Sequence, residues 1–175
     1  MTDGRLPFPF YYLGVAEAVS KRSTCMNKHY GAVIVKDNVI VSTGYNGAPR
    51  GRINCCERGN CFRIEAKIPR GTNYDLCRSV HAEQNAIINA SREAMKGATM
   101  YLYGYDVING RVVEKASCCS ICKRMVINSG IEYVVFADME TGIPCSDTSV
   151  PYRYNTVKVS EWVENDDSLN AIGGY

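Results

Sequence analysis

The chain has 175 residues, of which 46% are hydrophobic and 22% are charged, and its formal net charge is +2 at pH 7. These values are typical of one globular domain spanning residues 1–175, and they lack the strong positive charge that favours nucleic-acid binding. No apolar stretch is long enough to cross a membrane, and residues 1–10 lack the apolar region of a signal peptide. The cytoplasm is therefore the expected location.

The first half of the chain predicts one helix followed by a β-hairpin. Apolar residues recur at roughly helical spacing over 11–22. Residues 31–41 contain two β-rich runs that flank Lys36-Asp37-Asn38, a pattern typical of a hairpin. Turn-forming residues dominate 45–52, and a cysteine-rich loop is expected to extend from there to about residue 78.

The second half alternates helices and strands. The expected elements, in order, are a helix over 81–95, a strand over 99–105, a hairpin turn at Asn109-Gly110, a helix over 119–129, a strand over 131–136, and a short strand and helical turn over 156–164. Such alternation is typical of a sheet covered by helices. We predict an α/β domain with three layers, α/β/α.

Two short motifs begin the two helices of the second half. They are His81-Ala82-Glu83 and Cys119-Ser120-Ile121-Cys122. One imidazole and two thiolates make a three-ligand zinc site that leaves the fourth position for water, whereas a structural zinc site closes with four protein ligands. Glu83 lies outside this ligand set and is expected to move protons as a general acid and base. Together these groups indicate hydrolytic deamination.

The positions of these residues favour metal binding over simpler interpretations. The start of a helix carries a partial positive charge that favours a thiolate, and Cys119 and Cys122 share one helix face. Taken alone, His81 is better explained as a core or surface histidine, the cysteine pair as a redox pair or half a zinc ribbon, and Glu83 as a surface acid. Their combination favours a catalytic zinc site.

Several further segments carry a family resemblance over about residues 11–138. They are Arg22-Ser23-Thr24-Cys25, Gly31 to Asp37, Ser42 to Pro49, His81 to Ile87, and Cys119-x-x-Cys122 with the following Ile127 to Ile131. With these segments the chain resembles the deoxycytidylate (dCMP) deaminases of the cytidine deaminase superfamily. The resemblance implies a central mixed sheet and zinc-dependent conversion of dCMP to dUMP and ammonia, which supplies dUMP for thymidylate synthesis. The Gly-Tyr-Asn-Gly segment favours this family over relatives that act on adenosine or free nucleosides.

The same resemblance implies roles for residues around the substrate. Asn46, next to Gly47, would hydrogen-bond the deoxyribose or the ring, and the backbone at Ala82 would contact the edge of the cytosine. Candidates for binding the 5′-phosphate, because they flank matching segments, are Arg22, Ser23 and Arg50. The alternatives are a plain tight turn at Asn46-Gly47 and solvated surface arginines. Family members are commonly homo-oligomers, and some are activated by dCTP and inhibited by dTTP.

This chain departs from the family pattern in two places. The residue before the first ligand cysteine is Cys118 rather than the usual proline, which places a competing thiol beside the site. The separation between His81 and Cys119 is longer than is typical of the family, and the hairpin around Asn109-Gly110 accounts for the excess. That hairpin could form a wall of the pocket or an oligomer contact.

The nine cysteines also suggest a second metal site. Clustered cysteines in a reducing compartment are more often metal ligands than disulfides. A second, structural zinc would fix the loop over 51–78, and the resemblance agrees, since some family members carry one in this region. The expected ligands are Cys25, Cys56, Cys61 and Cys77. Cys55 is an alternative to Cys56, His29 could replace one thiolate, and free thiols are the simpler interpretation.

Two other functions stay open from the sequence. The first is deamination of another cytosine nucleotide or nucleoside, such as dCTP or deoxycytidine, or of adenosine in tRNA. The near-neutral charge and the lack of a basic aromatic stripe argue against an RNA substrate. The second is a zinc-stabilised binding module without catalysis. Glu83 favours a deaminase over such a binding module, because a purely structural zinc needs a fourth ligand and no free acid.

Overall fold

A mixed β-sheet forms the centre of the computed structural model, which describes residues 4–69, 72–114, 116–147 and 149–164. The strands are β1 (Lys28–Lys36), β2 (Val39–Tyr45), β3 (Thr99–Asp106), β4 (Arg111–Val112), β5 (Tyr133–Asp138), β6 (Ile143–Pro144) and β7 (Arg153–Lys158). Their order in the sheet is β2-β1-β3-β5-β7-β6, and β4 pairs with β3. The pair β3–β5 is parallel and the other pairs are antiparallel. This mixed sheet agrees with the prediction.

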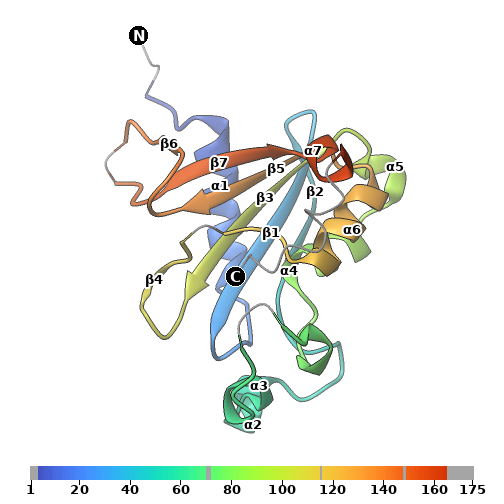
Figure 1. The fold of residues 1–175 in the computed structure, drawn as a ribbon. Helices are drawn as coiled ribbons and strands as arrows, with labels where there is room; N and C mark the ends of the chain where they lie inside the picture. Colours follow the sequence, from blue (N-terminus) through green and yellow to red (C-terminus); the bar gives the residue numbers. More distant parts are fainter. Residues whose placement is uncertain (1–3, 70–71, 115, 148, 165–175) are drawn as a thin grey trace.

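Helices cover both faces of this sheet. The helices are α1 (Phe8–Ser20), α2 (Cys55–Arg58), α3 (Phe62–Glu65), the 3-10 helix η1 (Tyr74–Leu76), α4 (Ala82–Ile88), α5 (Arg92–Met95), α6 (Ser120–Ser129) and α7 (Ser160–Glu164). Figure 1 shows α1 on one side of the sheet and α4 and α6 on the other, with α2 and α3 projecting below it. The three-layer α/β/α prediction is therefore confirmed. Within the described residues, no helix has the length and apolar character needed to cross a membrane.

Alternation along β1 builds a separate core on each face of the sheet. Val33 and Val35 are buried in the cluster that contains α1, whereas Ala32 and Ile34 are buried in the cluster that contains α4 and α6. Successive side chains of a strand point to opposite faces, so a strand that is buried on both sides reads as a continuous apolar run. This explains why residues 31–35 are hydrophobic without interruption.

Two glycines let helices approach the sheet at backbone distance. A Cβ atom at Gly31 would lie 2.0 Å from the Ala16 carbonyl oxygen of α1, and one at Gly44 would lie 2.3 Å from the Ala82 carbonyl oxygen of α4. Glycine is the residue that permits such close packing. Gly44 therefore fixes the start of α4, which carries the first predicted metal ligand, against β2.

The structure refines several predicted elements. The expected hairpin is β1–β2, whose turn residues Asp37 and Asn38 have φ angles of 50° and 62°, the left-handed values that a two-residue hairpin turn requires. The single helix expected over 81–95 is wrong, because the helix breaks between α4 and α5. Ser91 accepts a hydrogen bond from Ala94 N at 3.2 Å and so starts a new helix.

Candidate active site

Three metal-binding side chains that are distant in the sequence meet at one point. His81 Nδ1 lies 3.5 Å from Cys119 Sγ and 3.4 Å from Cys122 Sγ. Their three donor atoms all lie within 4.8 Å of one another. Nitrogen and sulfur ligands of one tetrahedral zinc, at ordinary bond lengths, would be about 3.6 Å apart. The spacing and the chemistry of these donors therefore fit one zinc ion.

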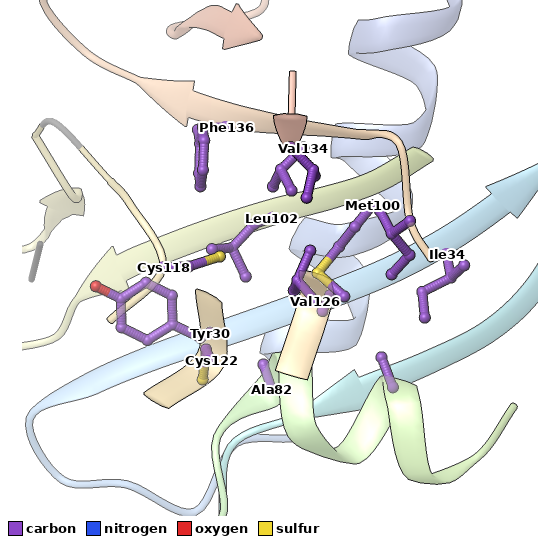
Figure 2. Close-up of a cluster of buried hydrophobic side chains, with 14 of the residues drawn as sticks. Tyr30, Ile34, Ala82, Met100, Leu102, Cys118, Cys122, Val126, Val134 and Phe136 are labelled. Carbon is purple, nitrogen blue, oxygen red and sulfur yellow. The ribbon is translucent and has the colours of Figure 1, made fainter. Parts of the chain in front are cut away.

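The starts of two adjacent helices hold these donors in place. His81 is the N-cap of α4, and its backbone N–H donates to Gln84 Oε1 at 2.9 Å. Cys119 is the N-cap of α6, and its sulfur accepts from Cys122 N at 3.5 Å. Cys122 belongs to the buried cluster that lies against the sheet, as Figure 2 shows. The hydrophobic core thus positions the site directly.

The three donors differ in how readily they lose their protons. A hydrogen bond from Cys122, followed by one from His81, lowers the pKa of the Cys119 thiol to about 4. The same hydrogen bond, together with burial, raises the pKa of Cys122. Burial lowers the pKa of His81, but its hydrogen bond with Cys119 and the charge of Glu83 outweigh burial and raise it. Zinc binding at this site would therefore release protons.

Glu83 lies beside the donors but outside their cluster. Its side chain is 0% exposed, and it lines a cleft together with His81 and Ala82. Cys118 is also fully buried and hydrogen-bonds to Glu83. Burial and the charge of Glu83 hold the pKa of Cys118 well above its usual range, so this thiol resists ionisation. Of the two adjacent cysteines, Cys119 is the one in the metal-binding cluster, in agreement with the preferred spacing.

Residues 10–138 match the model of the family described as the cytidine and deoxycytidylate deaminase zinc-binding region. The chain belongs to this family. It is 37% identical over 132 residues to the deoxycytidylate deaminase of Mycobacterium phage D29, an alignment that covers 72% of this chain and 91% of the relative.

Two further relatives agree. The human deoxycytidylate deaminase is 34% identical over 180 aligned positions, which cover 97% of this chain and 91% of the relative. The crystal structure of the dCMP deaminase from cyanophage S-TIM5 in apo form superimposes with a TM-score of 0.52 at 25% identity, covering 75% of this chain and 82% of that chain. The family match includes both halves of the predicted zinc site.

The deaminase cleft also contains the predicted Asn46, but its amide is engaged within the protein. Asn46 Oδ1 accepts from Tyr30 N and from Ser23 Oγ, each at 2.7 Å, and its Nδ2 donates to Lys28 O at 2.9 Å. Gly47 pairs with Val80 through two backbone hydrogen bonds. Asn46 therefore ties β2 to the start of β1 and shapes the cleft, with one N–H of its amide left for a ligand.

The two arginines predicted to bind phosphate lie elsewhere on the surface. Arg22 is exposed, and Arg50 is exposed and donates to Asn89 Oδ1 at 3.1 Å. Neither arginine lines the cleft, and Ser23 reaches it only through Asn46. Their proposed contact with a phosphate therefore stays a prediction.

Three cleft residues have no signal in the sequence motifs. Lys28 comes from the start of β1, and Arg63 and Tyr74 come from the cysteine-rich segment. The Arg63 guanidinium lies 5.0 Å from the centre of the Tyr74 ring, and that ring meets the His81 ring edge to face at 5.5 Å. The cysteine-rich segment thus contacts the zinc site directly, a contact that only the folded chain reveals.

Three of the four cysteines predicted to bind a second zinc border the deaminase cleft. Cys25, Cys61 and Cys77 line it. Burial first, and then the nearby thiols of Cys61, Cys25 and Cys77, raise the pKa of Cys55. Cys55 is buried whereas Cys56 is exposed. In the described parts of the chain no second group of donors is as close as the first, so these thiols are farther apart than in a closed site.

Proposed function

We propose that the protein is a zinc-dependent hydrolase that converts dCMP and water to dUMP and ammonia. The observation that carries this proposal is the His81, Cys119 and Cys122 donor set beside the buried carboxylate of Glu83 in one cleft. Similarity to proteins named deoxycytidylate deaminase supports the choice of substrate.

In this mechanism His81, Cys119 and Cys122 would hold the zinc. Bound there, zinc supplies a Lewis acid that lowers the pKa of water and so generates a nucleophile near neutral pH. Three protein ligands leave one coordination position for this chemistry. The side chains are held by α4 and α6, and both helices are anchored to the core, so the site needs little rearrangement to bind the ion.

Glu83 would carry the protons. It takes a proton from the attacking water and gives one to the ring nitrogen next to the reacting carbon of cytosine. It then moves the remaining proton of the added hydroxyl to the exocyclic amine, so that the carbon–nitrogen bond breaks, ammonia leaves and a new carbonyl forms at the reacting carbon. The 0% exposure of Glu83 keeps bulk water away from these transfers and strengthens its electrostatic effect.

We also propose a second, structural zinc held by Cys25, Cys61, Cys77 and one of the adjacent pair Cys55 and Cys56. Four thiolates make a closed structural site. Burial of Cys55 and its electrostatic contact with the other three thiols favour Cys55 over Cys56. The N–H of Asn27 donates to Cys25 Sγ at 3.5 Å, the kind of hydrogen bond that stabilises a metal-bound thiolate. His29 contacts the Cys25 carbonyl oxygen through Nε2 at 2.9 Å, which disfavours it as a ligand.

Assembly and regulation are inferred from the family resemblance, whereas the location is the expectation from the sequence. We propose that the protein is a cytoplasmic homo-oligomer and that dCTP and dTTP act as effectors. Light scattering of the purified protein measures the first property. Assays at limiting dCMP, with and without each triphosphate, measure the second. A monomer with unaltered kinetics would contradict both.

The decisive experiment is ammonia release by the zinc-loaded protein against dCMP, dCTP, deoxycytidine, CMP and adenosine. We expect the largest kcat/KM with dCMP. A preference for another cytosine compound would keep the zinc chemistry and reassign the substrate. If zinc binds but none of the substrates releases ammonia, the zinc-stabilised binding module becomes the better interpretation.

A further inference from the structure

Two cationic side chains line the deaminase cleft, and neither belongs to the family motifs. Among the described residues of the cleft wall they are Lys28 and Arg63. Lys28 belongs to β1, and Arg63 belongs to α3 in the cysteine-rich segment. A cation that faces a cleft beside a catalytic centre is suited to binding an anionic part of the substrate, since charge-assisted hydrogen bonds are the strong ones.

Lys28 is buried and lies opposite the end of β3, next to the turn that leads to β4. Its side chain is 8% exposed, and in the β1–β3 register it lies directly opposite Asp106. Burial raises the pKa of Asp106, but hydrogen bonds from Asn109 and the charge of Lys28 outweigh burial and hold that pKa below its usual range.

Asp106 is itself fixed by the turn that follows β3. Its carboxylate accepts from Ile108 N at 3.1 Å, Asn109 N at 3.1 Å and Asn109 Nδ2 at 2.9 Å. The turn therefore orients the carboxylate, which lies opposite Lys28 in the strand register. Directly opposed charges on adjacent strands stabilise each other in this way. The charge of Asp106 thus lies next to Lys28, which lines the cleft.

Arg63 is held by contacts that leave its charge beside the active site. Its guanidinium donates to the carbonyl oxygens of Asn73 and, at 3.1 Å, of Pro69, and it lies over the Tyr74 ring. A guanidinium carries five N–H donors, so these contacts do not exhaust it. The charge of Arg63 also acts on His81, which places it near the catalytic donors.

We propose that Lys28 and Arg63 bind the 5′-phosphate of the nucleotide and so select a nucleoside monophosphate over the free nucleoside. This inference rests on the proposed deamination of dCMP. The two residues lie on different elements that border one cleft, so together they can contact different oxygens of the phosphate.

The test compares ligands with and without a phosphate in Lys28→Gln and Arg63→Gln. Steady-state kinetics with dCMP and deoxycytidine, and calorimetric titration with dUMP and deoxyuridine, are measured for each variant. Each substitution is expected to lower kcat/KM for dCMP, and to weaken dUMP binding, by about 10- to 100-fold. The values for deoxycytidine and deoxyuridine are expected to change by less than about 3-fold, because neither ligand carries a phosphate.

Matched controls come from the same elements. Lys36→Gln lies at the other end of β1, and Arg58→Gln lies in the same cysteine-rich segment with its side chain bonded to Asn60. Both control variants are expected to have wild-type kcat/KM values for dCMP and deoxycytidine, and wild-type affinities for dUMP and deoxyuridine. Melting curves of all variants check that the fold is retained.

Three outcomes would overturn the proposal. The first is that both variants keep the wild-type ratio of kcat/KM for dCMP to kcat/KM for deoxycytidine. They would also keep the wild-type ratio of the affinities for dUMP and deoxyuridine. The second is an equal loss for ligands with and without the phosphate, which would indicate a structural role. The third is selective loss of the phosphate-bearing ligands in Arg22→Gln or Arg50→Gln instead. Failure of the proposed function is distinct, since the wild-type protein would then fail to turn over dCMP or would prefer deoxycytidine.

Discussion

The zinc-site helices and the cysteine-rich segment over 52–78 border the same cleft but are built in opposite ways. In the first region, Glu83 and Cys122 are both 0% exposed, and the helices that carry them pack against the sheet. In the second region, Cys55 is the only buried residue among those that the structure describes. Four of its larger apolar side chains are exposed, namely Ile53, Phe62, Ile64 and Leu76.

This contrast separates two sources of order. The hydrophobic core holds α4 and α6 against the sheet, so the catalytic residues on these helices are held in fixed positions. The cysteine-rich segment has helices of only four residues and almost no core of its own. A segment of this kind needs crosslinks or a metal to hold one conformation. Substitutions in the first region should therefore lower kcat, and substitutions in the second region should raise KM.

The largest effect is expected from Glu83→Gln. The amide keeps the size of the side chain but cannot transfer protons, so kcat should fall by about 1,000-fold or more. Zinc content and melting temperature should match the wild-type protein, because Glu83 is not in the donor cluster. Glu93→Gln, an exposed substitution on the neighbouring helix α5, is the control and should retain full activity. Appreciable turnover by the Glu83 variant would contradict the assigned role.

The next largest effect is expected from Cys55, whose loss should change zinc binding while the loss of the adjacent Cys56 should not. Cys55→Ser should lose the second zinc, so that metal analysis falls from two ions per chain to one, whereas Cys56→Ser should keep both. Without that zinc the segment should become more sensitive to protease, and KM for dCMP should rise because Arg63 and Tyr74 lose their anchor. The sheet should melt at nearly the same temperature in both variants. One zinc per chain in the fully active wild-type protein would refute the second site.

A third variant tests the core region without touching a donor. Gly44→Ala places a Cβ 2.3 Å from the Ala82 carbonyl oxygen, so α4 must shift. We expect a loss of about 2–3 kcal/mol in the free energy of unfolding, and lower activity through displacement of His81. Gly14→Ala in α1 is the matched control, since its Cβ meets nothing within 4 Å and alanine favours a helix. Equal melting temperatures for the two variants would show that α4 can move freely.

The core region could be predicted from the sequence because its signals are local. The turn at Asp37 and Asn38, the apolar run of β1 and the cap positions of His81 and Cys119 each depend on neighbouring residues alone. The zinc donors followed from two such helix starts. The break at Ser91 was missed because a short helical pattern continues past it, and only its side-chain cap decides where the second helix begins.

The cleft wall could not be predicted, because its contacts join segments that are far apart in the sequence. Lys28 faces Asp106 only through the register of β1 and β3. Arg63 reaches the zinc site only through the way the cysteine-rich segment folds over Tyr74. The same limit applies to Cys55 and Cys56, since adjacent residues differ in burial according to how one short helix docks.

The smallest effect concerns the turn after β3, where Asp106 lies opposite Lys28. Asp106→Ala removes the acceptor of the turn and the partner of Lys28, and should cost about 1–2 kcal/mol at pH 7. The pKa of Asp106 is lowered in the folded protein, so its contribution is present above the unfolded value of about 3.9 and disappears as the pH falls through the folded value. The stability difference between the wild-type protein and the variant should therefore shrink below about pH 4. Asp147→Ala, in an exposed turn bonded to Ser149, is the control and should leave the melting temperature unchanged. A difference that persists at low pH would mean that turn geometry, and not the charge facing Lys28, stabilises the hairpin.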